Sequence, residues 1–79
     1  MSSTGAPPPS RSDEDRARRT ARALLHAASV FGDAERASIW LEAHNEALGG
    51  TIPLQLLATI EGDVIVRTEL AAIDHGLPV

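Results

Sequence analysis

The stretch WLEAHNEALGGTIPLQLL, Trp40 to Leu57, contains the signals that decide the fold. It continues a helical pattern, breaks that pattern at the pair Gly49 and Gly50, and restarts a helix with Thr51 and Pro53. A threonine hydroxyl can accept a hydrogen bond from a free amide of the first turn, so Thr51 is expected to cap the new helix. Proline is tolerated only in such a first turn. The stretch therefore predicts a corner between two helices, with the tryptophan before it in the core.

Two longer helices are predicted before this corner. Residues 13–31 repeat apolar side chains at spacings of three and four, which forms one face of an α-helix. Gly32 is expected to end this helix, and Asp33 stands where the N-cap of a second helix belongs. The expected stripe of the first helix is Ala21, Leu24, Leu25, Ala28 and Phe31, and that of the second is Ala34, Ala37, Trp40, Leu41 and His44.

The segment 59–76 is predicted to be a helix in spite of the strand-prone run Val64–Val66. Its apolar residues step by four, three and four, which is a helical spacing. Thr59 is a suitable N-cap and Gly76 a suitable stop. The apolar face is Val66, Leu70, Ile73 and Leu77, and the polar face is Asp63, Arg67 and Asp74.

The expected fold is all-α, a small compact bundle of about four helices. The third helix is short and contains Leu54, Leu56 and Leu57. Residues 1–12, rich in Ser, Gly and Pro, are expected to form a disordered tail, and residues 13–79 the helical domain. A chain of 79 residues without cysteine has a small core and no disulfide to stabilise it. Association, as a homo-oligomer or with another protein, is therefore expected.

The charge of the chain argues against nucleic acid as its partner. The net charge is −4 and the pI is about 5.1, whereas phosphate binding needs clustered basic charge. The cluster Arg16, Arg18, Arg19 and Arg22 is expected to form a solvated helix face, with Glu14 pairing with Arg18 and Asp15 with Arg19. No apolar stretch is typical of a secretory signal or a membrane span, so a cytoplasmic protein without membrane contact is expected.

No group of residues is typical of catalysis or metal binding. His26, His44 and His75 are 18 and 31 residues apart, and none has a second ligand at a suitable spacing on its helical face. Asp74 adjoins His75, but neighbours on a helix do not face each other, and no nucleophile with a positioned base is present. We therefore expect a protein that is not an enzyme and has no metal or other cofactor.

An ordered set of motifs runs through the segment 31–76. It comprises an Ala before Trp-Leu, a spaced Asn, Leu-Gly-Gly, Thr-x-Pro with leucines, a Gly that opens the last helix, and a final Leu-x-x-Ile-x-x-Gly. The positions are Ala37, Trp40, Leu41, Asn45, Leu48, Gly49, Gly50, Thr51, Pro53, Leu54, Leu57, Gly62, Val66, Leu70, Ile73 and Gly76. In this order and spacing the segment resembles the toxin-binding domain of the Xre/MbcA/ParS-like antitoxins, the partners of RES-domain toxins.

The resemblance implies a type II antitoxin that binds and neutralises a RES-domain toxin, an enzyme that consumes NAD or transfers ADP-ribose from it. It also implies that the C-terminal segment blocks the toxin's active site. A terminal carboxylate at Val79 could occupy positive groups that bind a pyrophosphate. The expected toxin contacts are Leu54, Leu57, Ile73, His75, Gly76, Leu77, Pro78 and Val79. The motif residues Trp40, Leu41, Asn45, Leu48, Gly49, Gly50, Thr51 and Pro53 are expected to be structural.

The implied partner is a cognate RES-domain toxin, in a complex that can include more than one copy of either chain. Trp40 is predicted to support binding through stability rather than through direct contact. Many relatives carry a helix-turn-helix DNA-binding domain before the match, whereas here only the expected tail and one helix precede it. Nucleic acid is therefore not an expected partner of this chain alone. The alternative function is a small helical DNA-binding or regulatory adaptor that uses the Arg-rich first helix.

Overall fold

The computed structural model describes residues 7–76, which form an all-α fold with no regular strand. Its elements are α1 (Arg11–Phe31), α2 (Ala34–Glu42), the short 3₁₀ helix η1 (Glu46–Leu48), α3 (Pro53–Leu56) and α4 (Ile60–Asp74). The predicted fold class is confirmed, as is the helical reading of the segment that contains Val64–Val66. The expected tail overlaps the fold, because α1 begins at Arg11, two residues before the predicted start. Residues 1–6 of that tail lie outside the described residues.

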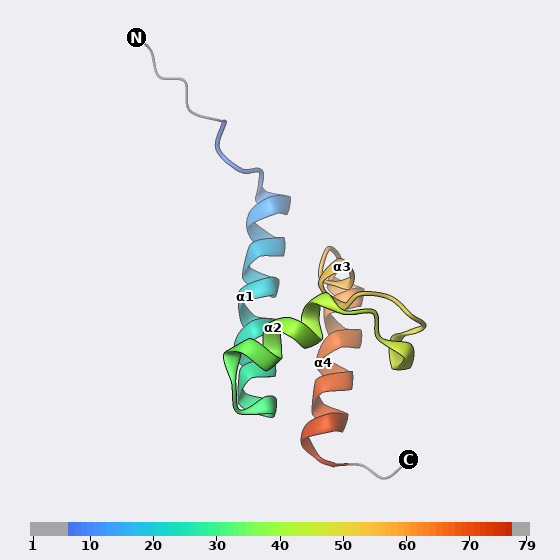
Figure 1. Ribbon diagram of the computed structural model, residues 1–79. Helices are drawn as coiled ribbons and strands as arrows, with labels where there is room; N and C mark the ends of the chain where they lie inside the picture. The colour runs from blue at the N-terminus through green and yellow to red at the C-terminus, as the bar shows by residue number, and fades with distance from the viewer. Residues whose placement is uncertain (1–6, 77–79) are drawn as a thin grey trace.

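The two long helices, α1 and α4, pack side by side and run in the same direction (Figure 1). The shorter α2 crosses α1, and α3 lies against the beginning of α4. The first turns of α1 project beyond the other helices. The core therefore lies where α1, α2 and α4 meet, and it consists of Ala23, Ala27, Ala37, Leu41, Leu57, Val66 and Leu70.

Local capping signals account for most helix ends. The side chain of Asp33 accepts a hydrogen bond from the Glu35 amide at 3.2 Å, and Thr59 Oγ1 accepts one from the Gly62 amide at 2.9 Å. Gly32 ends α1 in the left-handed conformation, with φ of 74°. These three predicted caps are confirmed, because each depends only on residues within one turn.

The corner between α2 and α3 differs from its prediction at Thr51. The N-cap position of α3 is occupied by Ile52, and Thr51 instead pairs with Asn45, whose amide donates to the Thr51 carbonyl at 3.1 Å. The amide of Gly50 donates to the Asn45 carbonyl at 2.8 Å, which closes the loop. The predicted Thr51 cap is wrong because the backbone bridge, rather than a side-chain cap, holds this residue. Pro53 is the first residue of α3, as predicted.

The buried face of α1 is rotated from the predicted stripe. Ala21 is exposed and Leu25 is 72% exposed, whereas Arg19, Ala23 and Ala27 are buried. The other stripe residues, Leu24, Ala28 and Phe31, are partly buried against the core. The reason is that α1 packs on both α2 and α4, and its small alanines allow both helices to approach closely.

The predicted stripe of α2 is correct only in its middle. Ala37 and Leu41 are buried, and Trp40 is partly buried at the edge of the core. Ala34, in the first turn, and His44 are exposed. Because α2 ends at Glu42, His44 lies beyond the helix and cannot continue its face.

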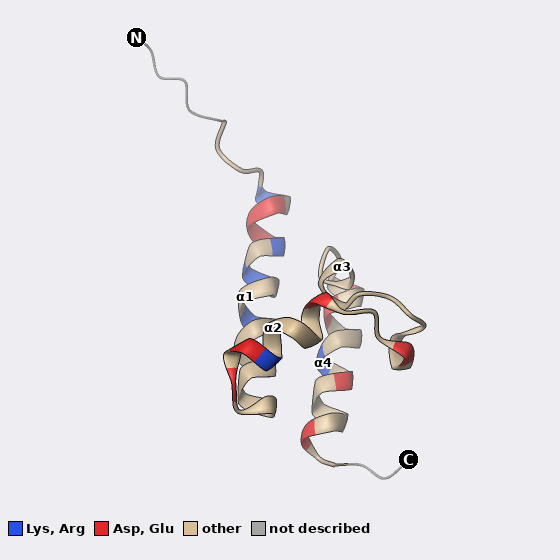
Figure 2. Cartoon of the chain, in the orientation of Figure 1, with Lys and Arg blue, Asp and Glu red and all other residues tan. Residues whose placement is uncertain are grey.

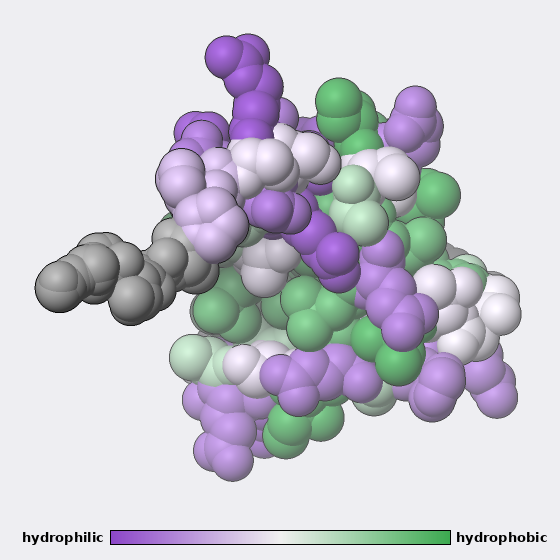
Figure 3. Space-filling view, turned by 90° about the horizontal axis from the view of Figure 1, so that it is seen from above, coloured by the Kyte–Doolittle hydropathy of each residue, from purple (hydrophilic) through white to green (hydrophobic). Residues whose placement is uncertain are grey.

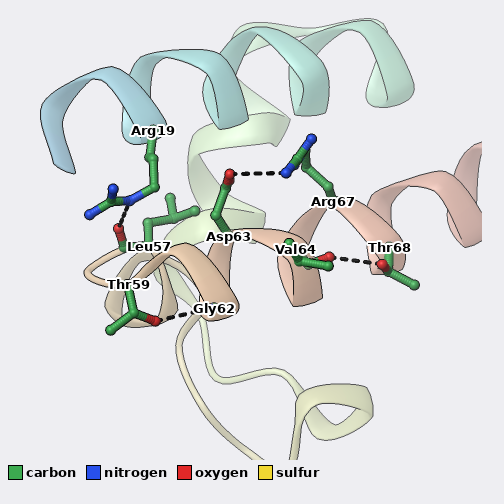
Figure 4. A network of polar contacts seen from close by, with 8 residues as sticks. All are labelled: Arg19, Leu57, Thr59, Gly62, Asp63, Val64, Arg67 and Thr68. Carbon is green, nitrogen blue, oxygen red and sulfur yellow. Dashed lines mark hydrogen bonds and ion pairs between the residues drawn. The ribbon is translucent and has the colours of Figure 1, made fainter. Parts of the chain in front are cut away.

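On α4, Val66 and Leu70 are buried as predicted, whereas Ile73 lies at the exposed end of the helix, 37% exposed. Asp63 was expected on a polar face but is only 5% exposed. Its Oδ2 lies 3.4 Å from Nη2 of Arg67, one turn later on the same predicted polar face (Figure 4). A carboxylate can be buried at this position because the ion pair compensates its charge.

The start of α4 is held to the end of α3 by a close backbone contact and by a side chain of α1. A Cβ atom on Gly62 would lie 2.6 Å from the carbonyl carbon of Leu56 and 3.0 Å from its Cα. Arg19 reaches from α1 to the same junction, where Nε donates to the Leu57 carbonyl at 2.8 Å (Figure 4) and Nη2 donates to the Ala58 carbonyl at 3.0 Å. Together these contacts determine where α4 begins.

Substitution Gly62→Ala is expected to lower the free energy of unfolding by about 1–3 kcal/mol, because the new Cβ meets backbone atoms that cannot rotate away. Helix propensity alone predicts that alanine at this position would raise the free energy of unfolding. Urea unfolding followed by circular dichroism measures the change. The control Ser29→Ala, at an exposed position of α1, should be neutral or slightly stabilising. A Gly62→Ala variant as stable as the wild type would contradict the close contact.

Substitution Arg19→Met is expected to cost about 2 kcal/mol, because it leaves the Leu57 and Ala58 carbonyls without their donor while keeping much of the apolar stem. The matched control is Arg18→Met, which removes an exposed guanidinium 3.6 Å from Asp15. Such surface pairs contribute little, about 0–1 kcal/mol. Equal losses from the two substitutions, measured by the same unfolding assay, would show that Arg19 has no special role at the junction.

Candidate functional site

The residues predicted to contact the toxin do not all reach the surface. Leu57 is fully buried in the core, so its assignment as a contact residue is wrong: its side chain packs between the helices instead. Leu54 is partly buried against that core. Ile73, His75 and Gly76 are exposed at the C-terminal end of α4. The remaining predicted contacts, Leu77, Pro78 and Val79, lie outside the described residues.

The predicted structural motif is brought together in the corner between α2 and α3. Leu41 and Pro53 are buried, and Asn45 bridges to Thr51. The side chain of Asn45 also accepts a hydrogen bond from the Ala47 amide at 2.9 Å, at the start of η1, which contains Leu48. The glycines that follow adopt positive φ angles, 72° at Gly49 and 82° at Gly50. Each of these residues has a conformational or packing role that explains its place in the motif.

Trp40 has two environments. One side of the residue packs against the core, and its ring centroid lies 5.9 Å from that of Phe31 at an interplanar angle of 45°. The same residue also lines a surface groove of about 380 Å³, so Trp40 is not a wholly buried core residue. We call this feature the α2 groove. It is lined by Phe31, Arg36, Ile39, Trp40, Ala43, His44 and Asn45.

The α2 groove is mainly apolar, and Arg36 is the one charged residue in its lining. Ile39 is 61% exposed, although it is a large apolar side chain. His44 Nδ1 lies 2.9 Å from the Gly50 carbonyl oxygen, which can only accept, so the ring is oriented by a donated hydrogen bond. This groove is not among the sequence-based predictions, which assign Trp40 and His44 to a core stripe and give no role to Ile39.

A second hollow, of about 370 Å³, lies between the first turns of α1 and the start of α4. Its lining includes Arg19, whose guanidinium is already bound to two backbone carbonyls. Arg11, Ser12, Asp15, Ala58, Thr59 and Ile60 complete the lining. Arg19 therefore acts at the helix junction and is not free to bind a ligand with all of its donors.

The Arg-rich cluster of α1 does not form a single solvated face. Arg16, Arg18 and Arg22 are exposed, whereas Arg19 is buried. The predicted pairs of Glu14 with Arg18 and of Asp15 with Arg19 are wrong. Asp15 instead pairs with Arg18, at a spacing of three residues rather than four. In Figure 2 most of the basic residues of α1 follow an acidic band near the start of the helix. This mixture of charges is not a continuous basic surface.

Within residues 7–76, no group of three or more histidine, cysteine, aspartate or glutamate side chains could hold a metal ion. None of the helices in this range has the length and apolar character needed to cross a membrane.

Comparison with known proteins identifies the family. Residues 26–76 match the model of the antitoxin Xre/MbcA/ParS C-terminal toxin-binding domain. A similar curated protein is the antitoxin Xre of Pseudomonas putida (strain KT2440), 36% identical over 64 residues. The aligned region covers 81% of this chain and 40% of that relative. The matched segment extends from the last turns of α1 past the end of α4, so the chain belongs to the Xre/MbcA/ParS antitoxin C-terminal toxin-binding domain family.

Proposed function

We propose that this chain is a type II antitoxin, which neutralises a RES-domain toxin by binding to it directly in the cytoplasm. The observation that carries the proposal is the family match. It covers the last six residues of α1 and all of α2, α3 and α4, and it contains every residue of the core except Ala23. The matched segment thus holds nearly all of the core, and the folded chain can present a surface to a protein partner.

Exposed apolar side chains support a protein partner. Leu25, Ile39, Ile60, Val64, Ile65 and Ile73 all have at least a third of their surface in solvent. Seen from the end where α4 begins, apolar atoms reach the surface between polar ones (Figure 3). Burying such side chains against another protein would be favourable, so their exposure is compatible with a protein partner.

We place the inhibitory contact of the proposed complex at the C-terminal end of α4. The exposed residues Ile73, His75 and Gly76 lead into the segment Leu77–Val79, which contains two apolar side chains. This segment would enter the NAD-binding site of the toxin and exclude its substrate. Leu54 would contribute from the edge of the core, whereas buried Leu57 would support the surface from within.

Co-expression of the full chain with a RES-domain toxin from the same genome tests both parts of the proposal. The full chain should bind the toxin, restore growth and preserve cellular NAD. A chain lacking Leu77–Val79 should still bind, because the folded domain is intact, but should protect NAD much less. Cell growth, NAD concentration and co-purification are the three measurements.

The control deletion is Ser2–Ala6, which lies outside the family match and should leave neutralisation unchanged. If the full chain neither binds nor protects, the antitoxin function itself is refuted. If the chain without Leu77–Val79 protects NAD as well as the full chain does, the antitoxin function stands and the C-terminal blocking mechanism is refuted.

A further inference from the structure

We propose that the α2 groove is a docking site for the toxin, and that it receives an apolar side chain standing next to a carboxylate on the toxin surface. This inference rests on the proposed antitoxin function and adds a second contact surface, separate from the C-terminal end of α4. Four observations support it: the apolar lining of the groove, the arginine in that lining, the ordered corner beside it, and its position within the family match.

The floor of the groove fits an apolar side chain. Phe31 and Trp40 lie in contact, and Ile39 and Ala43 extend the apolar surface along α2. Ile39 keeps 61% of its surface in water in the free chain, which is unfavourable for a side chain of this size. Aromatic residues are also enriched among the residues that contribute most to binding at protein interfaces.

The rim of the groove fits an acidic group. Its lining includes Arg36 and no aspartate or glutamate, although the chain as a whole has a net charge of −4. The guanidinium of Arg36 can donate two parallel hydrogen bonds to a carboxylate. Asn45 and His44 add polar atoms beyond the C-terminal end of α2, whereas Arg36 lies in its first turn. The groove therefore combines an apolar lining with one positive group on a chain of net negative charge.

The end wall of the groove is formed in advance by the corner after α2. His44 is oriented by its bond to the Gly50 carbonyl, and Asn45 is fixed by its backbone bridge to Thr51 and its side-chain bond to Ala47. A surface that is ordered before binding loses less entropy when a partner docks. The motif residues of the corner thus shape a binding surface as well as a turn.

Position in the sequence distinguishes the groove from the hollow beside Arg19. All seven lining residues of the groove lie between Phe31 and Asn45, within the toxin-binding domain match of residues 26–76. The other hollow takes Arg11, Ser12, Asp15 and Arg19 from α1 before that match begins. A toxin contact common to the domain is therefore better placed at the α2 groove.

The test compares Ile39→Glu with Leu25→Glu in the full chain. Both substitutions place a carboxylate at an exposed apolar position on a helix, but Leu25 lies on α1 outside the groove and before the family match. Isothermal titration with a RES-domain toxin made inactive by mutation measures the Kd. Ile39→Glu should weaken binding by roughly tenfold or more, and Leu25→Glu should leave the Kd nearly unchanged. Circular dichroism should show both variants folded.

A second pair tests the charge at the rim. Arg36→Ala should weaken binding and reduce its dependence on salt, whereas Arg22→Ala, at an exposed arginine of α1, should do neither. Equal affinities for the wild type, Ile39→Glu and Arg36→Ala would overturn the groove while leaving the antitoxin function intact. If Ile39→Glu changes only the self-association of the free chain in light scattering, the groove is a homomeric interface and this inference is wrong. No binding by the wild type would refute the antitoxin function and this inference together.

Discussion

The contact of the Arg19 guanidinium with the carbonyls of Leu57 and Ala58 is the interaction on which the arrangement of the helices depends. It joins α1 to the junction of α3 and α4 across 38 and 39 residues of sequence. Gly62 allows that junction to be tight, since no side chain separates the first turn of α4 from the backbone of Leu56. With the start of α4 held there, Val66 and Leu70 are directed onto the alanines of α1.

The corner between α2 and α3 connects this fold to its proposed use. Trp40 packs on the core and also lines the α2 groove, so a single residue links stability with surface shape. Asn45, Gly50 and Thr51 close the loop that orients His44 at the end of the groove. The prediction that Trp40 acts only through stability is therefore replaced by the proposal that it also forms part of the docking surface.

Most of the helix caps could be predicted from the sequence, whereas the orientation of α1 could not. The caps Asp33 and Thr59 and the position of Pro53 follow from local hydrogen bonding and from ring geometry. The orientation of α1 does not, because its apolar residues cover a wide arc, and only contact with two helices selects Ala23 and Ala27 over Ala21 and Leu25. An arginine in a charged run gives no sign that it will be buried. The acceptors of Arg19 are backbone carbonyls, and because every residue has one, the sequence does not mark which carbonyls will bind it.

The candidate site shows the same division. The motif from Trp40 to Pro53 indicated the family, but the α2 groove arises from Phe31 on one helix and Ile39 on another, together with the corner. No spacing within one segment specifies such a surface. One signal in the sequence could have indicated it. On a helical projection of α2, Ile39 is an apolar residue on the side opposite Ala37 and Leu41.

Fluorine NMR tests the central claim most directly, because Trp40 is the only tryptophan of the chain and lines the groove. A chain labelled with fluorotryptophan gives one resonance, which can be followed as an unlabelled, catalytically inactive RES-domain toxin is added. If the toxin docks in the α2 groove, the chemical shift of Trp40 should change and saturate in parallel with complex formation. A complex that co-elutes in gel filtration while the Trp40 chemical shift stays at its free value would contradict docking at this groove.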